Sequence, residues 1–324
     1  MSQRLNTKSF IIILVLLFNI FSIYKFNQKI NQSDTTTTTT VTTTTSSSTE
    51  NNLLKMESKS YDFKNQDGQS DTLYYLEYKP PRPSQDYRYP VFIFLHGASK
   101  SGKGLEDLNT KLRTAVIPKY IEGGQWGSLP FLVICPQSSD GWTSTNIVNV
   151  LGAIKTTYKD IIDDTRIYLT GQSMGGGGIW RWALASKEID DIAALIVICG
   201  AACKCSTPQQ QSYFFFDTNY YNLYYIFVAP PYKIDSNEMV SSNIPVWAFN
   251  NENDSTVSAQ TSQRWVDINN QMGISPPSKI TIFKGVTGHD AWTQAFNPIK
   301  QDNPTYVYDW LLSFTNIRKH NRTE

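Results

Sequence analysis

The chain has 324 residues, of which 40% are hydrophobic, and this length suits one large domain or two small ones with a sizeable buried core. Its 29 lysines and arginines nearly balance its 28 aspartates and glutamates, and no basic stripe stands out. These values exclude a disordered chain and give no reason to expect a nucleic acid or an acidic polymer as partner.

The first predicted element is an apolar segment near the amino terminus, with the sequence FIIILVLLFNIFSIY at residues 10–24. Its length fits both a signal anchor and the apolar region of a signal peptide. No small-x-small cleavage site follows, so the sequence favours an uncleaved signal anchor over residues 10–26. The flanking charges favour a cytoplasmic segment at residues 1–9. We therefore expect a single-pass membrane protein with its bulk luminal or extracellular; a cleaved signal and secretion are the alternative.

A threonine- and serine-rich linker is predicted at residues 27–59. Its SDTTTTTTVTTTTSSST stretch cannot form a core, and it indicates either an O-glycosylated stalk or a low-complexity spacer. Sequons at Asn31, Asn253 and Asn321 would be glycan acceptors in a luminal or extracellular compartment.

A globular domain is predicted over residues 60–318, followed by a polar tail at 319–324. Short apolar runs rich in β-branched and aromatic residues alternate there with helical patterns. The predicted strands are residues 73–78, 91–96, 131–135, 166–171, 192–199, 245–250 and 279–284. Several of these runs are continuously apolar, which is typical of strands buried on both faces of a parallel sheet.

Helices are predicted between the strands. From Asn146 to Asp163, apolar residues recur every three or four positions and form one stripe on a helix. Similar patterns cover residues 176–188, 257–272 and 304–316, and a poorer one, interrupted by Pro118, covers 105–123. The alternation predicts a doubly wound, mostly parallel α/β sheet. It lapses between Cys199 and Pro245, where an aromatic-rich insertion forms either a lid or binding loop, or an aromatic sub-core.

A glycine-flanked serine lies where a predicted strand meets a predicted helix. Gly171-Gln172-Ser173-Met174-Gly175 matches the pattern G-x-S-x-G at this strand-to-helix turn. A serine in such a turn is strained, and small residues two positions before and after it give the necessary room. The amino end of the following helix favours negative charge on the serine oxygen. The pattern therefore predicts Ser173 as a nucleophile.

A serine nucleophile needs a base and an acid that orients the base. The chain has three histidines: His96 at a strand end far upstream, His320 in the tail, and His289 just after the final strand. The position of His289 predicts that it is the base. Asp254, in the loop after the penultimate strand, is the predicted acid, with Glu252 as the alternative.

An oxyanion hole needs two backbone N–H donors aimed at the developing charge. We expect them from Met174, which follows the nucleophile, and from Ala98, in the turn after the strand at 91–96. His96 is then interpreted as a structural clasp for that turn. A glycan on Asn253 would crowd the catalytic residues, so we predict that Asn253 is unmodified.

Four cysteines are too few for a disulfide scaffold in a chain of this length. Cys135 and Cys199 end apolar runs and are predicted to be buried as small hydrophobes, while Cys203 and Cys205 lie in a loop where a bridge could form. A metal site built from Cys199, Cys203 and Cys205 has no nearby histidine and no recognisable ligand spacing. We expect no metal and no cofactor.

Five motifs taken in order carry a family resemblance: FLHGASKSGKG, VICPQ, RIYLTGQSMGGGGIW, PVWAFNNENDSTV and GHDAWTQAF. Over about residues 60–316 the chain resembles α/β-hydrolase esterases of the phospholipase/carboxylesterase and "predicted peptidase" group, relatives of polyhydroxybutyrate depolymerase and feruloyl esterase-like proteins. The resemblance implies Ser173 as nucleophile, Asp254 as acid and His289 as base. The sequence departs from it at NNEND, where relatives usually have a His-Gly pair before the acid, and in its aromatic insertion.

These residues predict a serine hydrolase that cleaves small-molecule or lipid-like carboxylic esters through an acyl-enzyme intermediate. The aromatic insertion would bind an apolar or aromatic group of the substrate. Thioesters and peptides are alternative substrates, because the same three residues can cleave both. A further alternative is a catalytically silent, membrane-tethered binding module.

Overall fold

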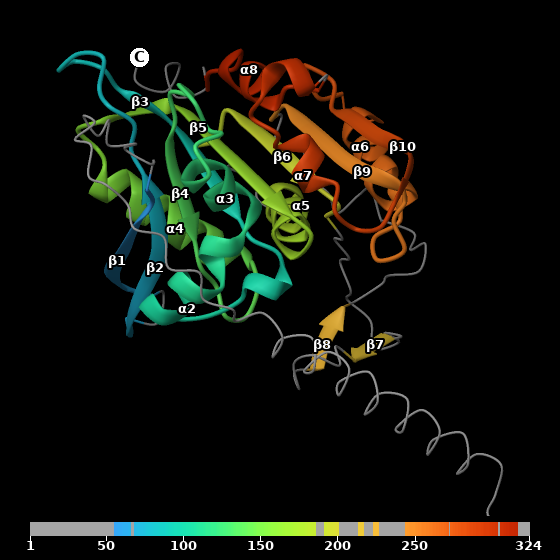
Figure 1. Cartoon of the computed structure of the whole chain (residues 1–324), viewed down its shortest axis with the longest axis horizontal. Coiled ribbons are helices and arrows are strands. Elements are labelled where there is room, and N and C mark those ends of the chain that lie inside the picture. Colours follow the sequence, from blue (N-terminus) through green and yellow to red (C-terminus); the bar gives the residue numbers. More distant parts are fainter. Residues whose placement is uncertain are drawn as a thin grey trace, which may run out of the picture. The chain divides into compact units, whose positions relative to one another are not determined.

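An eight-stranded sheet with helices on both faces organises the chain (Figure 1). The computed structural model describes residues 55–65, 68–185, 191–200, 213–216, 223–226, 244–271, 273–303 and 305–316. The strands of the sheet are β1 (Glu57–Lys64), β2 (Ser70–Tyr78), β3 (Tyr89–Leu95), β4 (Leu132–Pro136), β5 (Ile162–Gln172), β6 (Ala194–Ile198), β9 (Val246–Asn253) and β10 (Lys279–Thr287).

The strand order is β1-β2-β4-β3-β5-β6-β9-β10. β1 pairs antiparallel with β2, and β2 with β4, whereas every other neighbouring pair is parallel. The predicted doubly wound, mostly parallel sheet is therefore confirmed. Each predicted strand overlaps an observed one. β1 was not predicted, because an edge strand without fully buried residues lacks the apolar run that marks the others.

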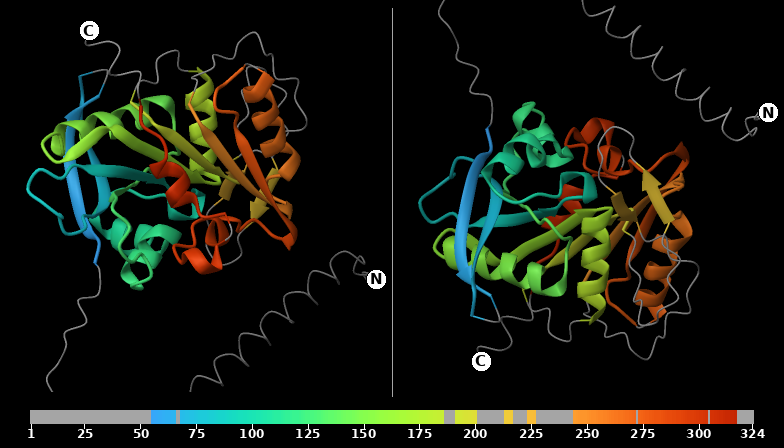
Figure 2. Two further views of the ribbon diagram at one scale, coloured as in Figure 1. Left: turned by 90° about the horizontal axis from the view of Figure 1, so that it is seen from above. Right: turned by 90° about the horizontal axis from the view of Figure 1, so that it is seen from below.

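Two hydrophobic layers pack on the sheet, one on each face. β3 shows why its sequence is continuously apolar: Val91, Ile93 and Leu95 enter one layer, and Phe92 and Phe94 enter the other. The first layer is covered by α4 (Ser144–Thr157), α5 (Met174–Ala185) and α6 (Ala259–Gln271). The second is covered by α2 (Leu105–Thr110), α3 (Val116–Glu122), α7 (Trp292–Ala295) and α8 (Val307–Leu312). Figure 2 shows these layers on opposite sides of the sheet.

The poorer helical pattern at residues 105–123 corresponds to two short helices, α2 and α3, joined by the 3-10 turn Leu112–Thr114. Pro118 does not cause the interruption. It lies in the first turn of α3, where the backbone N–H that proline lacks would have no partner within the helix. The remaining helical predictions overlap α4, α5, α6 and α8.

Little of the predicted insertion is described. Two short strands, β7 (Tyr213–Phe216) and β8 (Leu223–Ile226), pair antiparallel in a sheet of their own. Most other residues between 200 and 244 lie outside the described residues, as do residues 27–54 of the predicted linker, Cys203, Cys205 and the tail at 319–324. The last residues of the predicted linker, 57–59, belong to β1. The choice between a lid and an aromatic sub-core therefore stays a prediction.

The predicted membrane location is contradicted by the structure. Within the part of the chain that is described, no helix is both long and apolar enough to cross a membrane. α4 is the longest described helix, with 14 residues, and at 1.5 Å per residue it measures about 21 Å against a hydrocarbon core of about 30 Å. The apolar segment at residues 10–26, from which the luminal or extracellular location was predicted, lies outside the described residues.

Candidate active site

Ser173 lies at a sharp turn between β5 and α5. Its φ of 52° falls in the left-handed region that residues other than glycine rarely adopt. The backbone is held on both sides, because Ser173 N donates to Ile198 O at 2.8 Å and Ser173 O accepts from Gly177 N at 2.9 Å. The turn therefore holds the predicted nucleophile at the carboxyl edge of the parallel strands, where ligands bind in sheets of this kind.

The glycines around Ser173 are required by close approach of the backbone. A Cβ on Gly175 would lie 2.2 Å from the carbonyl oxygen of Leu95 in β3, and one on Gly171 would lie 2.7 Å from the carbonyl carbon of Gly175. A Cβ on Gly178 would lie 2.4 Å from the Cβ of Trp142. These separations are well inside the normal contact distance of about 3.5–4.0 Å. Larger residues would push α5 away from the sheet.

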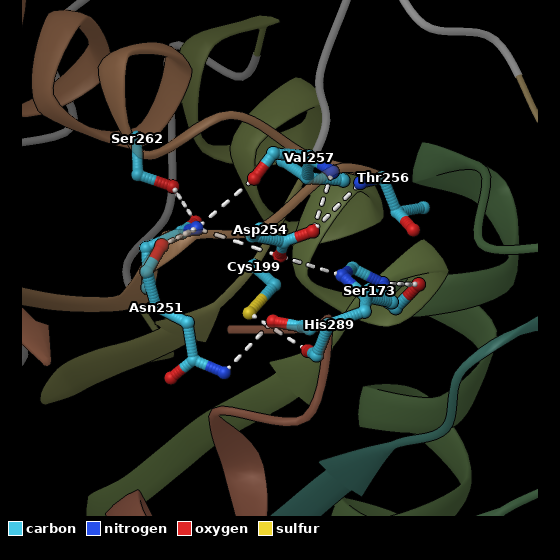
Figure 3. A network of polar contacts seen from close by, with 10 residues as sticks. Ser173, Cys199, Asn251, Asp254, Thr256, Val257, Ser262 and His289 are labelled. Atoms are coloured by element: carbon cyan, nitrogen blue, oxygen red, sulfur yellow. Dashed lines mark hydrogen bonds and ion pairs between the residues drawn. The ribbon is translucent and has the colours of Figure 1, made fainter. Parts of the chain in front are cut away.

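The structure brings His289 to Ser173 from 116 residues away. The Nε2 atom of His289 lies 2.9 Å from Ser173 Oγ, and its Nδ1 atom lies 2.7 Å from Asp254 Oδ2 (Figure 3). An ionised carboxylate only accepts hydrogen bonds, so Nδ1 carries the proton that Asp254 binds. In the neutral imidazole, Nε2 then has a lone pair directed at the serine hydroxyl and can remove its proton.

Asp254 lies at the centre of a set of hydrogen-bond donors. Its Oδ1 atom accepts from the backbone N–H groups of Thr256 at 2.8 Å and Val257 at 3.0 Å. Burial alone would raise the pKa of Asp254, but the hydrogen bonds from His289 and from these N–H groups outweigh burial and hold the pKa below its ordinary value. The carboxylate therefore stays charged and can stabilise a protonated His289.

The alternative acid, Glu252, is occupied elsewhere. Its Oε1 atom lies 2.9 Å from Lys284 Nζ, and its Oε2 atom accepts from Gly285 N at 2.8 Å. The hydrogen bond from Lys284 contributes most to a pKa below the ordinary value for glutamate. The structure thus brings Asp254, rather than Glu252, to His289.

His96 fixes the loop that contains the predicted oxyanion donor Ala98. It is fully buried, its Nδ1 atom lies 2.9 Å from Gly97 O, and its Nε2 atom accepts from Ser138 N at 3.0 Å. The indole N–H of Trp142 donates to the carbonyl of His96 at 3.0 Å. Burial lowers the pKa of His96 to about 4, so the ring is neutral and can accept the Ser138 hydrogen bond. These contacts agree with a structural clasp.

The two predicted oxyanion donors, Met174 and Ala98, belong to segments that lie next to Ser173. Met174 is the first residue of α5, where backbone N–H groups have no partner within the helix. Ala98 begins the 3-10 turn Ala98–Lys100, and a Cβ on the preceding Gly97 would lie 3.4 Å from the Cβ of Ser173. The loop that contains Ala98 is therefore adjacent to Ser173.

Cys199 is a site residue that the sequence identified only as a buried small hydrophobe. Cys199 and Cys135 are both buried free thiols, but Cys199 also donates its thiol to His289 O at 3.3 Å. Burial, reinforced by the charge of Asp254, raises the pKa of Cys199 well above its ordinary value, so the thiol keeps its proton. Ligand atoms of Cys199, Asp254 and His289 lie within 4.8 Å of one another and could hold a metal ion. A cation there would displace the hydrogen bond between His289 and Asp254.

Two asparagines in the NNEND segment also contact the site. Asn251 Nδ2 donates to Gly288 O at 2.9 Å, and Asn250 Nδ2 lies 3.5 Å from Asp254 Oδ2. Asn250 is anchored in turn, because Ser262 in α6 donates to its Oδ1 atom at 2.7 Å. NNEND is where the sequence departs from the esterases that it resembles, and this departure was the signal that could have identified both residues.

Comparisons with known proteins identify the fold. No family model matches this chain, and no curated protein matches its sequence. Dipeptidyl peptidase 4 of Porphyromonas gingivalis is similar with a TM-score of 0.50 and 14% identity, over 80% of this chain and 36% of that one. An esterase of Pyrococcus furiosus has a TM-score of 0.49 and 14% identity, over 80% of this chain and 93% of that one. A crystal structure of a thermostable esterase gives a TM-score of 0.47 and 19% identity, over 80% and 63%. The chain has the α/β-hydrolase fold.

Proposed function

We propose that the protein is a serine hydrolase that cleaves carboxylic esters through Ser173, His289 and Asp254, the triad. The observation that carries this proposal is the unbroken chain of hydrogen bonds from Ser173 Oγ to His289 Nε2, at 2.9 Å, and from His289 Nδ1 to Asp254, at 2.7 Å. This chain joins a strained, rigidly held serine to an imidazole and a buried carboxylate. The α/β-hydrolase fold places such a group at the same edge of its sheet.

In the first half of the reaction, His289 Nε2 removes the proton of Ser173 as Oγ attacks the carbonyl carbon of the ester. The N–H groups of Met174 and Ala98 would stabilise the resulting oxyanion. His289 then gives its proton to the departing alcohol, and an acyl group stays on Ser173. A water molecule then attacks the acyl carbon while His289 Nε2 removes one of its protons, and His289 returns this proton to Ser173 Oγ as the bond between Oγ and the acyl carbon breaks, which releases the carboxylic acid and regenerates the serine. Asp254 stabilises the imidazolium in both halves.

The proposal is tested by labelling the folded full chain with a fluorophosphonate, which reacts with activated serines. We expect labelling of the native protein and none in Ser173→Ala. Labelling that survives this substitution would refute the assignment of the nucleophile. No labelling of a folded native chain would instead indicate a binding module. Turnover of matched p-nitrophenyl ester, thioester and peptide substrates then tests the substrate class, and a preference for the thioester or the peptide would contradict the ester assignment.

A further inference from the structure

We infer that Cys199 and Asn251 are positioning residues that hold the histidine loop, residues 288–291, and thereby fix the imidazole of His289 between Ser173 and Asp254. This inference rests on the proposed function, since it concerns the geometry of the same triad. We call these two residues the histidine-loop clamp.

The clamp contacts two consecutive carbonyl groups of the loop. Asn251 Nδ2 donates to Gly288 O at 2.9 Å, and the thiol of Cys199 donates to His289 O at 3.3 Å (Figure 3). Gly288 N also donates to Asn253 O at 3.2 Å, at the end of β9. The loop is therefore held by residues at the ends of β6 and β9, two neighbouring strands. The contacts fall on Gly288 and on His289, the predicted base.

The backbone of Cys199 supports a positioning role. Its φ is 48°, and among the described residues only Ser173 and Cys199 adopt a positive φ without being glycine. Strained conformations of this kind persist where the surrounding structure requires them, and they concentrate at functional sites. The strain is held in place by the hydrogen bond from Cys199 N to Phe249 O at 2.9 Å. A glycine would fit this conformation without strain, but it would not provide the thiol that contacts His289.

Asn251 shows a second sign of a positioning role. Its side chain is almost fully buried, yet its Oδ1 atom accepts no hydrogen bond from any described residue. Rotating the amide by 180° would not help, because Oδ1 would then face the carbonyl oxygen of Gly288. A side chain that makes only part of its hydrogen bonds contributes little net stability. The contact with Gly288 is therefore the main result of placing an amide here.

Precise placement of the imidazole matters because one ring must satisfy two partners at once. Nε2 must reach Ser173 while Nδ1 stays bonded to Asp254, and a displacement of about 1 Å can lower a rate by about 100-fold. A side chain that only positions the base changes kcat and leaves the binding of substrate nearly unchanged.

The clamp is tested in the full chain with Cys199→Ala and Asn251→Ala. Each should lower kcat for a p-nitrophenyl ester by about 10- to 100-fold while KM changes less than about twofold. Cys199→Ser keeps a donor and should recover most of the loss. Matched controls are Cys135→Ala, which removes another buried free thiol, and Asn303→Ala, which removes another buried asparagine that donates to backbone carbonyls, those of Ala295 and Asn297. Both controls should keep the native kcat whatever their unfolding temperature.

A second readout does not need turnover. The Nδ1 proton of His289, bound to Asp254, should give a low-field proton NMR signal that is absent from His289→Ala. We expect this signal to be lost to exchange with water in both clamp variants and kept in both controls. A low-field signal and a kcat that persist in Cys199→Ala and Asn251→Ala would overturn the inference, as would equal losses of kcat in the controls or no recovery in Cys199→Ser. If the native chain hydrolyses no ester while the signal follows the expected pattern, the proposed function fails and the clamp stands. Should Cys199→Ala not fold, Asn251→Ala carries the same test.

Discussion

His96 makes the stability of the protein depend on pH in a way that can be calculated from the structure. Its pKa falls from the ordinary 6.5 to about 4 in the folded chain, because burial disfavours the charged ring. As the pH falls, His96 therefore becomes protonated at a higher pH in the unfolded chain than in the folded chain. The contribution of the neutral ring to stability is complete above pH 6.5 and is lost as the pH falls towards 4. Between about pH 7.5 and 4.5, these two pKa values predict a loss of roughly 2–3 kcal/mol in the free energy of unfolding.

The substitution that isolates this effect is His96→Gln, whose amide can still accept from Ser138 N but does not titrate. Urea unfolding is followed by tryptophan fluorescence for the native chain and the variant at both pH values. Carboxylates that titrate in both proteins cancel in the comparison, so the variant should lose roughly 2–3 kcal/mol less than the native chain on acidification. Equal losses in the two proteins would refute the buried, neutral state of His96. A larger loss in the variant would mean that the folded chain stabilises the protonated ring.

Two further predictions use matched pairs of substitutions. Gly175→Ala places a Cβ 2.2 Å from Leu95 O and should lower the free energy of unfolding by more than about 3 kcal/mol. Gly152 is exposed in α4 with open space around it, so Gly152→Ala should raise the free energy of unfolding by about 0.5–1 kcal/mol. Urea unfolding measures both changes, and equal effects would contradict the packing of α5 against β3. Asp254→Asn should reduce kcat by about 10⁴-fold, while Glu252→Gln should change kcat less than twofold. Steady-state ester hydrolysis by the two variants measures both effects, and the reverse result would identify Glu252 as the acid.

The fold was predictable because most of its strands are buried on both faces. The run at residues 91–96 is apolar at every position before His96, since alternate side chains enter opposite layers of the core. β1 was missed for the opposite reason, because it pairs on one side only and has no fully buried residue. The amphipathic pattern likewise found α4, but it could not show that the segment at 105–123 divides into two helices.

The predicted triad residues could be named from the sequence because their chemistry and chain order are restrictive. Three histidines left one plausible base, and the G-x-S-x-G turn is defined by local spacing. The clamp could not be found in this way. Cys199 and His289 are 90 residues apart, and Asn251 and Gly288 are 37 residues apart, so their contacts depend on the order of strands in the sheet. The departure at NNEND marks Asn251 as unusual without showing what it contacts, and a buried cysteine has no sequence pattern that distinguishes a role in the site from ordinary packing.

The strand order also links the predicted nucleophile, Ser173, to the clamp. β5, β6 and β9 are parallel neighbours, so Ser173, Cys199 and Asn251 all occupy the same edge of the sheet. Ser173 N is bonded to Ile198 O, the residue directly before Cys199, and Cys199 N is bonded to Phe249 O. The two strained residues are thus joined by one short path of backbone hydrogen bonds. A shift of the end of β6 would move the serine and the support of the histidine loop together, which explains why both strained positions lie at this edge.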